Sequence, residues 1–196
     1  MIKDKKKVCV FASATNELDE VYYQAAKELG ELIAKNGYSI VYGGSHRGLM
    51  YACAGAVQAA GSDLYGVMPQ KMVDIGFDNP QDCKEFYITK GMRERKAKID
   101  ELSDAVVALA GGFGTFEELS EIIVQKQLGY NEKPIVILNT MGFYDNLIRF
   151  FEDFIQKGFA HSEARKVYYV ANTPKEAIEY IKTYKPEETY VKYHLR

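Results

Sequence analysis

Apolar runs of strand length alternate along the whole chain with longer segments whose apolar positions recur at helical spacing. The two patterns are distinguishable because a strand is a short run, whereas an amphipathic helix repeats apolar residues three and four positions apart. The predicted strands are 8–11, 38–42, 64–68, 85–88, 105–109, 135–138 and 167–170. The predicted helices are 19–35, 92–102, 143–156 and 174–184, together with a segment that follows 43–44 and ends near 61 and a segment that opens within 110–118 and continues through 119–128.

Most of the predicted strands are nearly continuous apolar runs, which is typical of strands buried on both faces of a parallel sheet. Their alternation with helices predicts an α/β fold, namely a Rossmann-like doubly wound parallel sheet with helices on both faces. We expect a single domain over 1–184, followed by a C-terminal arm over 185–196. Residues 70–81 show no clear periodicity and are predicted to form a loop over the site.

In open parallel sheets, ligands bind outside the carboxyl ends of the strands. This rule places four loops in one crevice: 12–16, which contains Ser13, 43–48, 69–81 and 111–118. We therefore expect the binding and catalytic residues in this crevice.

The segment 110–118 joins a buried strand to a helix through Gly111, Gly112 and Gly114. Glycines at such a turn let backbone N–H groups approach a phosphate closely. Glu117 and Glu118 are expected in the first helical turn, beside that anion, which points to chemistry on a nucleotide. An alternative stays open: Thr115 and Glu118 have the spacing of a capping box, in which both side chains satisfy N–H groups at the helix start.

A second glycine turn, Gly43-Gly44-Ser45-His46-Arg47-Gly48, follows the second predicted strand. One such turn is weak evidence for a ligand, but two at equivalent strand ends are stronger. We therefore take Gly43 and Gly44 as candidate binding residues. The chain has neither a Walker lysine pattern nor a GxGxxG motif with an acidic residue at the next strand end, so an NTPase and an NAD enzyme are not favoured.

The run Met92-Arg93-Glu94-Arg95-Lys96 places three cations in the first turns of a predicted helix. Cations are unfavourable there by about 0.3–1 kcal/mol each because of the helix dipole. A bound phosphate would relieve this conflict, and an arginine can hold it with two hydrogen bonds. The alternative is a solvated basic face, with Lys96 and Lys98 as its main members.

Composition narrows the function further. The chain has 196 residues, a formal net charge of −2 and a hydrophobic content of 47%, so it lacks the basic footprint of a nucleic-acid-binding protein. Its three cysteines are an odd number without a CxxC pair, so neither a disulfide framework nor a metal site is indicated. No signal peptide or membrane span is recognisable, and we expect a soluble, cytoplasmic protein.

Two motifs together carry a family resemblance: Met92 with Arg95 and Lys96, and the GGxGTxxE pattern that ends at Glu118. They resemble the Lonely Guy family of cytokinin-activating phosphoribohydrolases, formerly mislabelled as lysine decarboxylases, and the similarity covers about residues 7–183. The resemblance implies a homodimer that needs no cofactor and hydrolyses the N-glycosidic bond of a nucleoside 5′-monophosphate. Arg95 and Glu118 match the catalytic pair of the family. The matching substrate-binding set is Lys96, Gly112, Gly114, Thr115 and Glu117.

The chain departs from the family pattern at several positions. Ser45 and Ala110 stand where the family usually has Gly and Pro, and both are expected to preserve the backbone. Tyr51, Lys71 and Val124 replace residues that are usually Gly, Glu and Thr, and these changes bear on base recognition. The base that is released, whether of a cytokinin riboside monophosphate or of AMP, is therefore left open.

Other functions on the same fold are a non-catalytic nucleotide sensor or molybdenum-cofactor carrier, a DNA-processing role, and a true lysine decarboxylase. A carrier needs the phosphate grip but not the carboxylate, so Arg95 together with Glu118 favours the enzyme. A decarboxylase needs a Schiff-base lysine at a pyridoxal phosphate site, and no lysine has such a setting. For the dimer interface, the sequence suggests the stripe of Ile122, Ile123 and Leu128.

Overall fold

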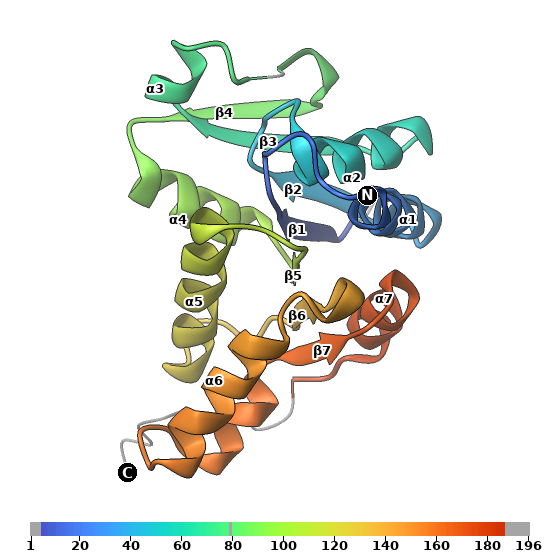
Figure 1. Ribbon diagram of the computed structural model, residues 1–196. Coiled ribbons are helices and arrows are strands. Elements are labelled where there is room, and N and C mark those ends of the chain that lie inside the picture. Colours follow the sequence, from blue (N-terminus) through green and yellow to red (C-terminus); the bar gives the residue numbers. More distant parts are fainter. Residues whose placement is uncertain (1–4, 79, 187–196) are drawn as a thin grey trace.

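The computed structural model describes residues 5–78 and 80–186, which form one seven-stranded parallel sheet (Figure 1). The strand order is β4-β3-β2-β1-β5-β6-β7. The strands are β1 (Lys7–Phe11), β2 (Ser39–Tyr42), β3 (Leu64–Pro69), β4 (Glu85–Thr89), β5 (Ala105–Ala108), β6 (Ile135–Leu138) and β7 (Tyr169–Ala171). The chain winds outward from β1 in one direction and then from β5 in the other, so the predicted doubly wound fold is confirmed.

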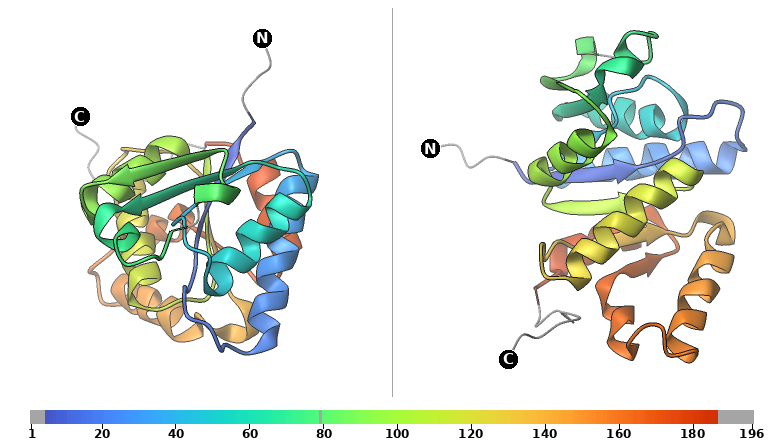
Figure 2. Two further views of the ribbon diagram at one scale, coloured as in Figure 1. Left: turned by 90° about the horizontal axis from the view of Figure 1, so that it is seen from above. Right: turned by 90° about the vertical axis from the view of Figure 1, so that its left-hand side faces the viewer.

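Helices cover both faces of this sheet (Figure 2). They are α1 (Glu20–Lys35), α2 (Gly48–Ala59), α3 (Gln70–Val73), α4 (Met92–Leu102), α5 (Phe113–Gln127), α6 (Asp145–Gln156) and α7 (Pro174–Thr183). The first core contains side chains of α1, α2 and α7, and the second contains side chains of α4, α5 and α6. Strand β1 shows why the predicted strands are continuously apolar: Val8 and Val10 enter the first core, whereas Cys9 and Phe11 enter the second.

Three sequence predictions need correction. Residues 70–81 are not a plain loop, because they contain the short helix α3 and the start of a 3₁₀ turn over Pro80–Asp82. The last strand begins at Tyr169 rather than at 167, because Ser162–Val167 forms a 3₁₀ turn that buries Val167. Helix α6 begins at Asp145 rather than at 143, after a 3₁₀ turn over Thr140–Gly142.

The winding direction changes between β1 and β5, and the loops that follow these two strands are in direct contact. The backbone N–H of Ser13 donates to the carbonyl oxygen of Ala110 at 3.1 Å. Across residues 5–78 and 80–186, no helix combines the length and apolar character needed to cross a membrane. The expected arm over 185–196 lies almost wholly outside the described residues.

Candidate active site

Three loops converge at this switch point. Ser13, which contacts the loop after β5, also accepts a hydrogen bond from the backbone N–H of Met50 in α2 at 3.2 Å. Gly48 packs so tightly on the same segment that a Cβ there would lie 2.5 Å from the carbonyl oxygen of Ser13. The candidate loops after β1, β2 and β5 are therefore brought together, as the sequence predicted.

The glycines of both turns make room for side chains of the site. A Cβ at Gly43 would lie 2.4 Å from Nη2 of Arg95, and a Cβ at Gly111 would lie 2.1 Å from Oγ1 of Thr115. Gly44 has a φ of 75°, in the left-handed region that glycine adopts without strain. The turn after β2 therefore brings the backbone against Arg95.

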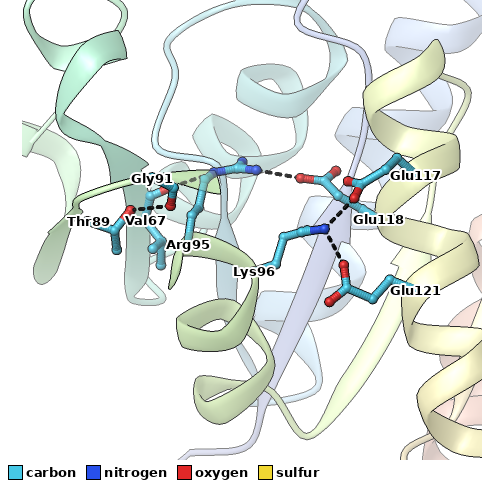
Figure 3. Close-up of polar contacts among 8 residues, drawn as sticks. All are labelled: Val67, Thr89, Gly91, Arg95, Lys96, Glu117, Glu118 and Glu121. Atoms are coloured by element: carbon cyan, nitrogen blue, oxygen red, sulfur yellow. Dashed lines mark hydrogen bonds and ion pairs between the residues drawn. The ribbon is translucent and has the colours of Figure 1, made fainter. Parts of the chain in front are cut away.

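Arg95 and Glu118 form a buried ion pair between α4 and α5 (Figure 3). Nη1 of Arg95 donates to Oε1 of Glu118 at 2.5 Å, and Nε donates to the carbonyl oxygen of Val67 at 3.0 Å. Each residue is 7% exposed. The guanidinium is thus held at both ends, by the end of β3 and by the carboxylate.

Burial raises the pKa of Glu118, and the neighbouring Arg95 guanidinium opposes this rise. A carboxylate with little water around it interacts strongly with any positive charge that develops nearby, because the local dielectric constant is low. Arg95 supplies the charge that favours the ionised form of this carboxylate.

Lys96, the next residue of α4, pairs with Glu117 and Glu121 of α5 (Figure 3). Its side chain is only 15% exposed, so the alternative of a solvated face is wrong for Lys96. Lys98 lies at the surface of α4, where it pairs with Glu101. Its Nζ is 4.6 Å from the centroid of the Tyr87 ring.

The N-terminus of α5 corrects two predictions. The helix begins at Phe113, with Gly112 as its N-cap and no capping hydrogen bond from a side chain. Thr115 is therefore a helical residue and not the N-cap, and the carboxylate of Glu118 accepts a hydrogen bond from Arg95. The capping-box alternative is wrong. Glu117 and Glu118 lie beyond the first turn, which contains no acidic residue. The helix starts earlier than predicted although Gly114, a residue that disfavours a helix, lies in its first turn.

The first N–H groups of any α-helix have no partner within the helix. In α5 these groups belong to Phe113, Gly114 and Thr115, and no side chain of the described residues caps them. Helix α2 differs, because Asn16 Oδ1 accepts from the Gly48 N–H at 3.1 Å. Of the N-termini of α2 and α5, that of α5 therefore presents unpaired N–H groups that can bind an anion.

Several functional contacts were not foreseen from the sequence. The carbonyl oxygen of Val67 accepts a hydrogen bond from Arg95, and the side chain of Met50 packs against Gly43. A backbone acceptor cannot be recognised from the sequence, because every residue type carries a carbonyl group. Glu121 had a signal that went unused, because it lies four positions after Glu117 and therefore on the same helix face. Within the described ranges, no group of three or more His, Cys, Asp and Glu side chains could hold a metal ion.

The positions that depart from the family pattern have different settings. Ala110 is buried and its carbonyl oxygen accepts from Ser13. The hydroxyl of Tyr51 donates to Asp82 at 2.8 Å. Lys71 in α3 and Val124 in α5 are exposed.

Sequence comparison identifies relatives over nearly the whole chain. The family model described as "Possible lysine decarboxylase" matches residues 50–181. The chain is 38% identical over 187 residues to the probable cytokinin riboside 5′-monophosphate phosphoribohydrolase LOGL2 of Oryza sativa subsp. japonica, covering 95% of this chain and 76% of that protein. It is 35% identical over 181 residues to the cytokinin riboside 5′-monophosphate phosphoribohydrolase LOG5 of Arabidopsis thaliana, covering 92% and 79%.

Solved structures share the fold at lower identity. The molybdenum cofactor carrier protein of Chlamydomonas reinhardtii matches with a TM-score of 0.68 and 23% identity, over 91% of this chain and 97% of that chain. DNA processing protein A of Helicobacter pylori matches with a TM-score of 0.53 and 19% identity, over 92% and 82%. These likenesses show a common Rossmann-like architecture. The family model and the sequence relatives go further, and they show that this chain belongs to the Lonely Guy (LOG) family, whose model carries the description of a possible lysine decarboxylase.

Proposed function

We propose that the protein is an enzyme that hydrolyses the N-glycosidic bond of a nucleoside 5′-monophosphate, releasing the free base and ribose 5-phosphate. The observation that carries this proposal is the buried Arg95–Glu118 pair beside the uncapped N-terminus of α5. The names of the LOG relatives support the same reaction for this chain. The proposed substrate is a cytokinin riboside monophosphate or AMP.

In this proposal, the N–H groups of Phe113, Gly114 and Thr115 bind the 5′-phosphate, assisted by the helix dipole. Anchoring the phosphate fixes the ribose against the reacting carboxylate. A guanidinium has five N–H donors, of which Arg95 directs one to Val67 and one to Glu118. We propose that a remaining donor also binds the phosphate. Gly111, Gly43, Gly44 and Ser13 shape the surrounding backbone.

Departure of the base generates a ribosyl cation with oxocarbenium character, as in other glycoside hydrolyses. Glu118 is proposed to stabilise that cation and to activate the attacking water. Lys96, held between Glu117 and Glu121, is proposed to neutralise the acidic face of α5 next to the bound phosphate. The reaction needs no cofactor in this scheme.

The test is an assay of the purified protein with a panel of nucleoside monophosphates that includes N6-substituted adenosine monophosphates. We expect release of the free base together with an equal amount of ribose 5-phosphate, and little reaction with the corresponding nucleosides, which lack the phosphate. Base release from nucleosides at the same rate would contradict the assigned role of the α5 terminus.

The second candidate is a non-catalytic carrier or nucleotide sensor, favoured by the structural likeness to the carrier protein of Chlamydomonas. A carrier would bind members of the panel without turning them over. A lysine decarboxylase is not supported, since the buried Lys126 lies at the C-terminal end of α5, away from both glycine turns, and donates to the carbonyl oxygen of Lys133 at 2.8 Å.

We also propose that the protein acts as a homodimer in the cytoplasm. The predicted interface stripe needs correction at Ile122, which is buried in the chain's own core, whereas Ile123 is largely buried but also lines the groove proposed below as the interface. Two exposed apolar residues of α5, Phe116 and Val124, border a groove of about 490 Å³ between α5, α6 and the segment after α6. None of the residues of α6 is buried, although that helix is strongly amphipathic. A second copy would cover this groove.

The proposed location rests on the cysteines. Cys9 and Cys53 are buried free thiols, and free thiols persist in a reducing compartment. Burial raises the pKa of Cys9 and Cys53, so both behave as core residues, as the sequence predicted.

A further inference from the structure

The connection between β3 and β4 is fastened to the glycine turn after β2. Ser45, in that turn, forms an antiparallel backbone bridge with Asp78. The next residue, His46, places its Nδ1 3.4 Å from the carbonyl oxygen of Asp78. Two consecutive residues of the turn therefore contact the same point of the connection.

Two side chains that follow in sequence extend this contact. The guanidinium of Arg47 lies 4.3 Å from the centroid of the Phe77 ring, within the range of a cation–π interaction. The hydroxyl of Tyr51, one turn into α2, donates to Oδ2 of Asp82 at 2.8 Å. All four residues are partly buried, so solvent screens these contacts less than it would at the surface.

The same turn lies against the catalytic arginine. Gly43 approaches Arg95 so closely that a Cβ would lie 2.4 Å from Nη2. The other terminal nitrogen of that guanidinium, Nη1, donates to Oε1 of Glu118 at 2.5 Å. A shift of the turn would therefore alter the position of the guanidinium relative to the carboxylate.

We propose that Arg47 and Tyr51 are positioning residues, which hold the turn after β2 in place through Phe77 and Asp82 and so keep Arg95 aligned with Glu118. This inference rests on the proposed function for its kinetic consequence, but its structural core does not depend on turnover. Neither residue touches the reacting groups; both act through Gly43 and Arg95.

The direct test is an NMR titration of the Glu118 carboxyl in the wild-type protein and in the double variant Arg47→Leu/Tyr51→Phe. The charged or titratable groups around this carboxyl are Arg95 and Lys96 on α4, Glu117 on α5 and Cys9 on β1. A displaced guanidinium favours the ionised carboxylate less, so the Glu118 pKa should rise in the double variant. The titration needs no substrate.

Kinetics give a second readout. In the double variant kcat should fall by about tenfold at acidic pH, because misplacement of a reacting group by a fraction of an ångström is costly. The acid limb of the kcat profile should move to higher pH, whereas KM should change less than kcat, because the proposed phosphate site is built mainly by the N–H groups of the α5 terminus. The variant Arg47→Lys/Tyr51→Phe keeps a cation over Phe77 and should recover part of the activity.

Tyr87→Phe is the matched control, because it also removes a hydrogen bond from a tyrosine to a carboxylate, that of Glu85, but on the edge strand β4. It should leave the Glu118 titration unchanged. An unchanged Glu118 titration in the double variant, with or without a lower melting temperature, would overturn the positioning proposal. If the wild-type protein releases no base, the proposed function is overturned. The Glu118 titration would still show whether Arg47 and Tyr51 position Arg95, because it needs no substrate.

Discussion

Arg95 and Glu118 are charged residues in a place where charge is poorly solvated. Removing one member of such a pair leaves the other charge uncompensated, at a cost of about 3–5 kcal/mol, whereas apolar residues of the same shape are often as stable as the pair. The pair is therefore better explained by a role in the proposed reaction than by a gain in folding stability. Its geometry is the residue-scale feature on which the proposed function depends.

Substitution of the carboxylate separates chemistry from binding. Glu118→Gln should lower kcat by about 10²–10³, comparable with the loss of one preorganised electrostatic group. Nucleotide affinity should change little, since the phosphate is held by the α5 terminus. Glu179→Gln is the matched control, because it also removes a helix carboxylate that pairs with a lysine, Lys182, but on α7. Steady-state kinetics and calorimetric binding measure both quantities, and wild-type turnover in Glu118→Gln would refute the assignment.

Lys126 predicts a pH dependence of stability. Burial lowers its pKa from 10.5 to about 8, with the charge of Glu132 opposing the shift. Between about pH 8 and pH 10.5 the unfolded chain binds this proton and the folded chain does not, so this residue makes the free energy of unfolding rise with pH in that window. Lys126→Met should stabilise the fold at pH 7 by about 1–2 kcal/mol.

The same substitution should flatten the rise in stability above pH 8. Urea denaturation at pH 7 and at pH 10 measures both effects. A Lys126→Met protein that is less stable at pH 7 and keeps the wild-type pH slope would show that the buried ammonium is stabilised by the Lys133 carbonyl and the Tyr184 ring.

At the scale of elements, helix packing determines whether a glycine inside a helix can be replaced by a larger residue. Gly30 in α1 faces α2 so closely that a Cβ would lie 2.3 Å from the Cys53 carbonyl oxygen. Gly55 in α2 has only the Tyr51 ring nearby, at 3.8 Å, which is ordinary contact. One helix-interior glycine is therefore required for close packing, whereas the other is not.

This difference gives a paired prediction of opposite sign. Gly55→Ala should stabilise the protein by about 1 kcal/mol, because alanine loses less backbone entropy in a helix. Gly30→Ala should destabilise it by about 1–3 kcal/mol, because the added methyl group overpacks the α1–α2 interface. Thermal unfolding of the two variants under identical conditions measures the signs. Stabilisation by Gly30→Ala would mean that α1 and α2 can separate without cost.

At the scale of the whole molecule, the exposed apolar groove beside α5 and α6 places the proposed dimer interface on the helix that carries Glu118. Large contiguous apolar surfaces on a folded chain commonly mark interaction sites. Assembly and catalysis would then share one structural element.

Sedimentation of the wild-type protein should give twice the chain mass of 22.2 kDa. Val124→Glu places a charge beside the groove and should yield the monomer, since an unpaired charge at an apolar interface is unfavourable. Ile75→Glu is the control, because Ile75 is exposed between α3 and β4, far from the groove. A wild-type monomer at micromolar concentration would refute the dimer.

Much of the fold was predictable because its signals are local. Short, mostly apolar runs identified the seven strands, and their alternation with helices predicted a doubly wound parallel sheet. The errors fall where tertiary contacts override local pattern, as at 162–167, where Val167 is buried in a 3₁₀ turn rather than in a strand. The start of α5 at Phe113 was missed because glycine disfavours a helix locally, although the packed turn accommodates it.

The candidate site also has features that the sequence predicts and features that depend on the tertiary structure. The sequence by itself determined the residue types of the site, two glycine turns, Arg95 and Glu118, because motif spacing is a property of the chain. Only the tertiary structure decided that Glu118 pairs with Arg95 rather than capping a helix, that Lys96 is shared by two carboxylates, and that Gly43 backs the guanidinium. The physical reason is that these contacts join residues from separate elements, so distance, burial and charge compensation exist only after β1, β2, β3, α4 and α5 have packed.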